Sequence, residues 1–170
     1  EDRLRITLSL LEADGLVDDA HALEFATHLG MRVLEGMTLE HPDVPRVVRE
    51  LSRRFRLGIV SNYPFGPVVT GSLERLGIAD AFDAVVVSGE VGWSKPHPKI
   101  FALALAALDA DPGRTVFVGD NPVADMEGAK VAGMWTAWYS VGRSPRPPAA
   151  ADFAFDRHAA LVPWCEERLS

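Results

Sequence analysis

Five side chains whose types could bind a phosphate ester and a divalent cation stand after short apolar runs of the sequence. They are Ser61, Asn62, Lys95, Asp120 and Asp125. A hydroxyl and backbone N–H groups at a strand-to-helix turn suit a phosphate oxygen, and a lysine offers a point charge to the same group. A hard cation such as Mg²⁺ takes one or two protein carboxylates plus substrate phosphate and water. The pattern therefore indicates metal-assisted phosphoryl chemistry.

Each of these signals is weak by itself. Ser61 and Asn62 are ordinary turn residues after a strand, and a lone loop lysine is usually solvated. Asp125 or Asn121 could simply cap a helix, and His97, between two prolines, is read as a rigid loop residue rather than a base. The signals gain weight because they occur in order, each after a successive apolar run.

The elements that must position these residues alternate along the chain from residue 57 onward. Short β-branched apolar runs predict strands, and apolar residues at helical spacing between them predict helices. The expected strands are 57–60, 84–87, 115–118, 134–139 and 153–155. The expected helices are 64–76, 98–108, 123–132 and 159–169. This alternation predicts an α/β fold with a Rossmann-like, doubly wound parallel sheet, whose chemistry lies beyond the carboxyl ends of its strands.

Residues 1–40 follow a different pattern, which predicts a helical hairpin without a strand. Leu4, Leu8 and Leu11 form one helical stripe, and Asp18 or Asp19 can cap a second helix. We therefore expect a partial helical cap at 1–40 and an α/β core at 41–170.

Composition favours a cytoplasmic protein that binds neither membranes nor nucleic acids. The 170 residues are 48% hydrophobic with a net charge of −7, and they contain one cysteine, Cys165. One cysteine excludes an internal disulfide framework, and neither a secretory signal nor a membrane span is evident in the sequence. The arginines around Arg53, Arg54 and Arg56 are interpreted as a solvated helix face.

Taken together, the three strand-end segments resemble motifs of the haloacid dehalogenase (HAD) superfamily, in the subgroup with a helical cap. Leu57–Asn62 resembles its second motif, Lys95–Phe101 its third and Gly119–Ala129 its fourth, and Val131–Thr136 continues the similarity. The resemblance is close over about residues 40–160 and loose over the cap.

The resemblance implies a Mg²⁺-dependent phosphatase that acts on a small phosphorylated metabolite through an aspartyl-phosphate intermediate. It implies that Ser61 binds the phosphoryl group, that Asn62 lines the substrate side and that Lys95 neutralises charge. Asp120 would ligate Mg²⁺, and Asp125 would ligate or orient it.

The sequence departs from the family at the first motif, Asp-x-Asp-Gly-Thr, which supplies the nucleophile at the end of a mid-sheet strand. No such segment is present; Leu10–Gly15 mimics it superficially, with Glu12 in place of the nucleophile, and is better read as the end of a cap helix. Three explanations stay open: a preceding stretch of the natural protein, a separate complementing chain, or a non-catalytic relative. We expect the chain alone to be inactive.

Two alternative functions also stay open. A 2-haloacid dehalogenase resembles this fold and keeps the lysine, but it works without metal and lacks the Gly119-Asp120 pair. A non-catalytic HAD-like binding protein would bind Mg²⁺ without turnover. Exposed apolar surface on the cap would support a homodimer, and the identity of the substrate is not predicted.

Overall fold

The computed structural model of the protein describes residues 41–140 and 146–169. It confirms the α/β fold, and each strand lies within a residue of its expected place. The strands are β1 (Gly58–Ser61), β2 (Ala84–Val87), β3 (Val116–Gly119), β4 (Trp135–Tyr139) and β5 (Phe153–Phe155). The expected helical cap at 1–40 lies outside the described residues and stays a prediction.

Helices connect the strands, as the periodicity predicts. The longer ones are α3 (Val44–Ser52), α4 (Gly66–Arg75), α6 (Pro98–Ala107) and α8 (Leu161–Leu169). Two segments differ in detail from the expectation. The single helix expected over 123–132 is a π-helical segment, η3 (Pro122–Glu127), continued by α7 (Gly128–Val131) and ended by Gly133 at a positive φ of 84°. The stretch expected to be a loop after β2 begins with one helical turn, α5 (Ser88–Val91).

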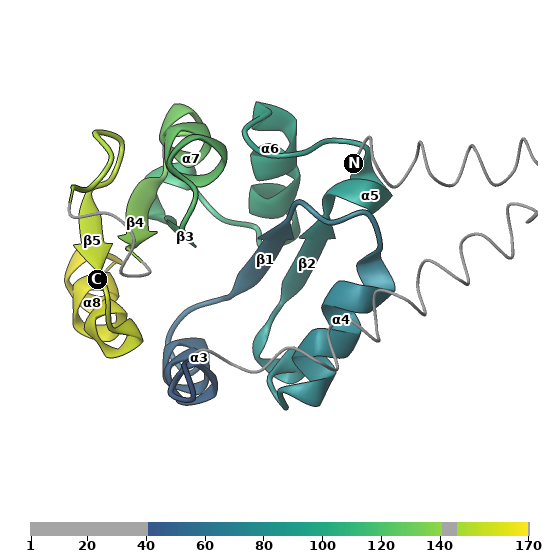
Figure 1. Ribbon diagram of the computed structural model, residues 1–170, viewed down its shortest axis with the longest axis horizontal. Coiled ribbons are helices and arrows are strands. Elements are labelled where there is room, and N and C mark those ends of the chain that lie inside the picture. The colour runs from purple at the N-terminus through teal and green to yellow at the C-terminus, as the bar shows by residue number, and fades with distance from the viewer. Residues whose placement is uncertain (1–40, 141–145, 170) are drawn as a thin grey trace, which may run out of the picture.

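All strand pairs are parallel, but they form two separate sheets. One sheet has the order β1-β2 and the other β3-β4-β5. Figure 1 shows α6 and α7 on one side of the strands and α3, α4 and α8 on the other. Within the described residues, β1 and β3 each have one edge without a strand partner.

A groove with a volume of about 850 Å³ lies between these two unpaired edges. Its walls include Ile59 and Val60 from β1, Val116 and Val118 from β3, and residues of α3, α6 and α8. The lining is mainly apolar, and Val118 is 44% exposed there. An apolar groove flanked by two open strand edges is an unusual surface, since such edges are normally paired or covered.

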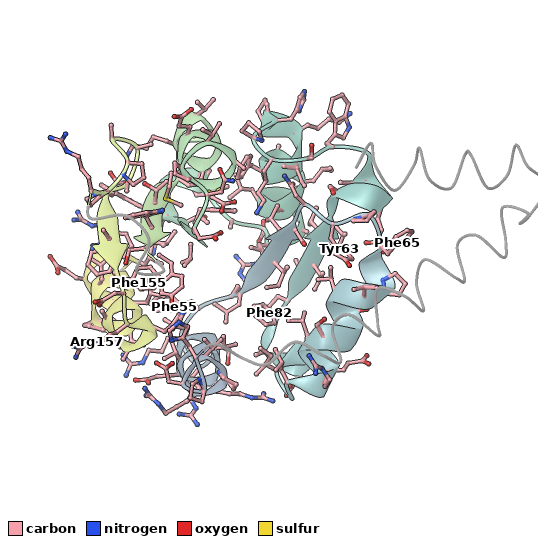
Figure 2. All side chains as sticks on the ribbon, viewed as in Figure 1. Phe55, Tyr63, Phe65, Phe82, Phe155 and Arg157 are labelled. Atoms are coloured by element: carbon pink, nitrogen blue, oxygen red, sulfur yellow. The ribbon has the colours of Figure 1, made fainter. Side chains whose placement is uncertain are left out.

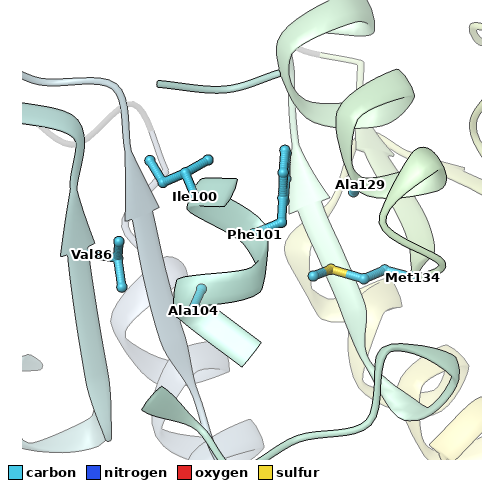
Figure 3. Packing of buried hydrophobic residues seen from close by; sticks show 6 residues of the cluster. All are labelled: Val86, Ile100, Phe101, Ala104, Ala129 and Met134. Carbon is cyan, nitrogen blue, oxygen red and sulfur yellow. The ribbon is translucent and has the colours of Figure 1, made fainter. Parts of the chain in front are cut away.

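The main core packs α6 between the β1-β2 sheet and the elements that follow β3. Its buried residues, shown in Figure 3, are Val86, Ile100, Phe101, Ala104, Ala129 and Met134. Phe101 is fully buried, and its ring meets the edge of Phe117 at a centroid distance of 5.2 Å. A Cβ atom at Gly128 would lie 2.7 Å from the same ring. This close packing fixes the first turn of α6, and with it the preceding loop, against the segment after β3.

The arginines expected on a solvated helix face, Arg53, Arg54 and Arg56, are exposed, but they follow the end of α3 at Ser52 and do not lie on a helix. Arg54 forms an ion pair with Glu166, and Arg56 lies 3.6 Å from Asp109. Cys165 is buried in α8, where burial raises the pKa of its thiol to about 11. Among the described residues, no helix is long and apolar enough to cross a membrane.

Replacing Phe101 with alanine should lower the free energy of unfolding by about 3–5 kcal/mol, because it removes a fully buried ring from a packed core. Leu103, two residues along the same helix, is 37% exposed, so Leu103→Ala should change it by less than about 1 kcal/mol. Urea denaturation followed by circular dichroism measures both. Equal losses for the two variants would show that α6 is not packed as described.

Candidate active site

The five residues singled out in the sequence lie in three segments that follow β1, β2 and β3. Ser61 is the last residue of β1, and Asn62 begins the turn behind it. Lys95 lies in the loop between α5 and α6, and Asp120 and Asp125 follow β3. Strands β1 and β2 are parallel and end at the same edge of one sheet. The segment after β3, which belongs to the other sheet, meets them through the contact between Lys95 and Asp125. Figure 2 shows Tyr63 and Phe65, in the turn after β1, beside α5.

A buried ion pair joins the second and third of these segments. The Nζ atom of Lys95 lies 2.8 Å from Oδ1 of Asp125, and the two side chains are only 13% and 6% exposed. The Lys95 ammonium also lies 5.3 Å from the centroid of the Phe117 ring. Neighbouring groups must stabilise two charges that are so little exposed to solvent, because desolvation of an ion pair costs several kcal/mol.

Asp125 is held from the other side by the backbone at the end of β3. Its Oδ2 accepts hydrogen bonds from the N–H groups of Asp120 (3.1 Å) and Asn121 (3.0 Å). The carboxylate comes so close to the strand that a Cβ atom at Gly119 would clash with it. Glycine is therefore required at this position, and Asp125 does more than cap a helix.

Asn62 fixes the backbone of Lys95 through a pair of hydrogen bonds. Its Nδ2 donates to the Lys95 carbonyl (2.9 Å), and its Oδ1 accepts from the Lys95 N–H (2.7 Å). The amide of Asn62 thereby ties the end of β1 to the lysine loop. In the described structure its contacts position Lys95, whereas the family resemblance implies contact with substrate.

Three further residues support the site, and two of them, Ser88 and Trp138, were not anticipated in these roles from the sequence. Asn121 caps the following helix, as the sequence allowed: its Oδ1 accepts hydrogen bonds from the N–H groups of Val123 and Ala124. Ser88, which is buried, donates its hydroxyl proton to the Tyr63 carbonyl. Trp138 donates its indole N–H to the Asp120 carbonyl at 3.0 Å. Of these contacts only the Asn121 cap carries a local signal, since the other two join residues 18 or more positions apart.

The carboxylates at the end of β3 fit a hard divalent cation such as Mg²⁺. Asp120 is exposed, and its carboxylate has no hydrogen bond or ion pair to another described residue. Oδ1 of Asp125 is buried and makes no hydrogen bond of good geometry beyond its ion pair with Lys95. Mg²⁺ binds through one or two carboxylates, so Asp120 is the direct ligand that this arrangement offers, with Asp125 beside it.

The groove between β1 and β3 reaches this site. Val60 and Val118, which line the groove, immediately precede Ser61 and Gly119 in their strands. An extended segment in the groove, running parallel to both strands, would therefore end between Ser61 and Asp120. The described residues around the site include no side chain placed as a nucleophile between them.

Similarities to other proteins agree with this architecture. The sequence model of the haloacid dehalogenase-like hydrolases matches residues 3–133. The chain is 32% identical over 156 residues to a phosphoglycolate phosphatase of Rhodospirillum rubrum, which is 90% of this chain and 64% of that protein. It spans only 30% of a phosphoserine phosphatase of Thermus thermophilus, to which it is 43% identical over 75 residues, 44% of this chain. The chain thus covers less than two thirds of the length of both relatives.

Solved structures show the same fold. A HAD phosphatase from Thermococcus onnurineus superimposes with a TM-score of 0.74 at 25% identity, over 96% of this chain and 78% of that one. A 2-haloacid dehalogenase from Pseudomonas syringae superimposes with a TM-score of 0.73 at 29% identity, over 99% of this chain and 71% of that one. With the family model covering well over half of its length, the chain belongs to the haloacid dehalogenase-like hydrolases.

Proposed function

We propose that the natural protein is a Mg²⁺-dependent phosphatase that hydrolyses a small phosphate monoester through an aspartyl-phosphate. The observation that carries the proposal is the buried Lys95–Asp125 ion pair beside the exposed carboxylate of Asp120. Such a set of a fixed cation and adjacent carboxylates suits a phosphoryl group and its metal, and phosphoryl transfer depends mainly on positioning and charge neutralisation.

Each residue has a distinct part in this proposal. Ser61 binds a non-bridging phosphate oxygen at the end of β1, and Lys95 neutralises charge on the phosphoryl group. Asn62 holds the Lys95 backbone in place. Asp120 and Asp125 would hold Mg²⁺, which would supply further neutralisation of the phosphate oxygens. The attacking carboxylate forms a bond to phosphorus while the bond from phosphorus to the ester oxygen breaks, and the departing oxygen takes up a proton from solvent to give the alcohol. Water then attacks the acyl phosphate, which releases inorganic phosphate and a proton and restores the carboxylate.

We further propose that the nucleophile comes from a strand seated in the groove between β1 and β3. Both strands have an unpaired edge there within the described part of the chain, and buried backbone groups left without partners cost about 1–3 kcal/mol each. A parallel apolar strand would pair both edges and cover Val60 and Val118. A carboxylate directly after that strand would lie between Ser61 and Asp120. The strand belongs either to a longer natural chain or to a separate complementing segment.

The alternative from another reaction class is a 2-haloacid dehalogenase. The structural similarity to the Pseudomonas syringae enzyme supports it. The exposed carboxylate of Asp120, beside the Lys95–Asp125 ion pair, favours the phosphatase, because a dehalogenase that works without metal does not need this carboxylate. A non-catalytic relative is the third possibility, and it too would keep the Asp120 and Asp125 site.

The first prediction concerns the reaction. The full-length gene product should release inorganic phosphate from p-nitrophenyl phosphate, and from some members of a panel of small phosphate monoesters, only when Mg²⁺ is present. EDTA should abolish the activity and excess Mg²⁺ should restore it. Chloride release from 2-chloropropionate that persists in EDTA would establish the dehalogenase instead. Mg²⁺ binding without turnover of either substrate class would establish the non-catalytic relative.

The second prediction concerns Lys95. Lys95→Met should lower kcat of the full-length gene product at least about 100-fold, the scale of losing one preorganised electrostatic contact to the reacting group. Lys99→Met is the matched control: its ammonium lies 4.6 Å from the centroid of the Trp93 ring in the same segment, and its rate should change less than about threefold. Thermal unfolding of both variants identifies any loss that comes from misfolding. Equal rates for folded Lys95→Met and wild type would remove Lys95 from the site.

The third prediction concerns the groove. In the full-length gene product, Val118→Arg should destabilise the fold by at least about 3 kcal/mol, because a strand in the groove would bury the new charge without a partner. Val131→Arg places the same charge on a side chain that is 79% exposed and outside the groove, and should change stability by less than about 0.5 kcal/mol. Urea denaturation measures both. If the two variants are equally stable, nothing fills the groove.

A further inference from the structure

We propose that His41, Asp43 and His158 form a second metal site, selective for Zn²⁺ or a similar transition-metal ion. Each residue offers one ligand atom, and these three atoms all lie within 4.8 Å of one another. Imidazole nitrogens with a carboxylate oxygen are a typical zinc ligand set, whereas Mg²⁺ prefers oxygen ligands. The proposal is independent of the phosphatase function and shares no residue with that site.

The three ligands come from distant parts of the sequence that the fold brings together. Asp43 is the residue before α3, His41 lies two positions earlier, and His158 begins η4 (His158–Ala160), the short helix after β5. Helix α3 contacts both η4 and α8. A metal ion here would therefore join the segment that enters α3 to the carboxyl end of the β3-β4-β5 sheet.

The nitrogen of His158 that faces Asp43 lacks the partner that its burial demands. Its Nδ1 atom is buried and has no hydrogen bond, and it lies 3.7 Å from Oδ1 of Asp43. Buried polar atoms are nearly always hydrogen-bonded, so an orphaned one calls for a missing partner. Two ligands of a tetrahedral zinc ion, each about 2.0–2.1 Å from the metal, lie roughly 3.3 Å apart. The observed separation is close to that spacing.

The other two ligands are also suited to a metal. Asp43 stands at the N-cap of α3, yet its side chain makes no capping hydrogen bond. His41 lies with its ring centroid 5.0 Å from that of His158. Burial lowers the pKa of the His158 imidazole. The nearby Asp43 carboxylate opposes that shift and His41 adds to it.

Tyr139 is a positioning residue for this site. Its hydroxyl contacts Nε2 of His41, and its ring packs against His158 at a centroid distance of 4.6 Å. Histidines that bind metals usually engage a second polar group through the ring nitrogen that does not ligate, which fixes the orientation of the ring. Tyr139 ends β4 and lies one residue beyond the register pair of Gly119 with Trp138. The proposed site therefore lies at the same sheet edge as the phosphate site, toward β5.

Isothermal titration of the metal-stripped protein with Zn²⁺ at pH 7 tests the proposal, with Co²⁺ absorption as a second readout of tetrahedral coordination. The wild type should bind one ion at a tight site, and Zn²⁺ should raise its unfolding temperature. His158→Gln and Asp43→Asn should each weaken that site at least about 100-fold, and Tyr139→Phe about tenfold, the range for losing an orienting partner.

Two controls separate this site from other ligands. His97→Asn removes an imidazole elsewhere and keeps a side-chain acceptor at the start of α6, so it should bind Zn²⁺ like the wild type. Asp120→Asn should also leave Zn²⁺ binding intact, which distinguishes this site from the proposed Mg²⁺ site. The proposal is overturned if the wild type binds no Zn²⁺, or if folded His158→Gln and Asp43→Asn, verified by circular dichroism, bind it as tightly as His97→Asn.

Discussion

The buried ion pair between Lys95 and Asp125 is the interaction on which the arrangement of the strand ends depends. A charge that is almost out of contact with water must keep its partner, since removing one member of such a pair leaves the other uncompensated. The pair therefore fixes the loop after β2 to the segment after β3. Asn62 extends the constraint to β1 through the Lys95 backbone, and the N–H groups of Asp120 and Asn121 extend it to the end of β3. A few polar contacts thus hold three segments together.

The same contacts explain how the carboxyl ends of β1, β2 and β3 stay close together although β1 and β3 are not paired. Strand pairing fixes β1 to β2 and β3 to β4, but no ladder joins β1 to β3 among the described residues. The connection between the sheets instead runs through α6, which contacts β1, β2 and α7, and through the Lys95–Asp125 pair. The groove is thus bounded on both sides by strands whose relative position is already set, which is the condition for a strand to enter without rebuilding its neighbours.

The strands and the polar residues of the site could largely be predicted from the sequence, because each is marked by a short local pattern. The short apolar run at 84–87 marked β2 at its observed bounds, and polar residues directly after such runs marked the site. The pairing of Lys95 with Asp125 and the clamp by Asn62 could not be read in this way, since they join residues about 30 positions apart. The π-helical form of η3 could not be predicted from hydrophobic periodicity either. It accompanies local polar contacts: Asn121 caps two N–H groups, and the Asp125 carboxylate accepts a hydrogen bond at the end of β3. The proposed zinc site gave no sequence signal either, since His158 lies far along the chain from the other two ligands.

The charges of the site bear on the choice between the proposed reactions. In the described structure Lys95 is already paired with Asp125, while Asp120 presents an uncompensated carboxylate to solvent. A nucleophilic carboxylate on a strand seated in the groove would add a further negative charge. The Lys95 ammonium would then face three carboxylates: this one and those of Asp120 and Asp125. Such a site would repel a phosphate dianion at a distance where Coulomb energies are large in a partly desolvated pocket. A divalent cation held by Asp120 would reverse this balance, because bound cations are often the largest local charges in a site. The excess of carboxylates is therefore itself an argument for metal-dependent phosphoryl transfer over metal-free dehalogenation, whose substrate carries less charge to be neutralised.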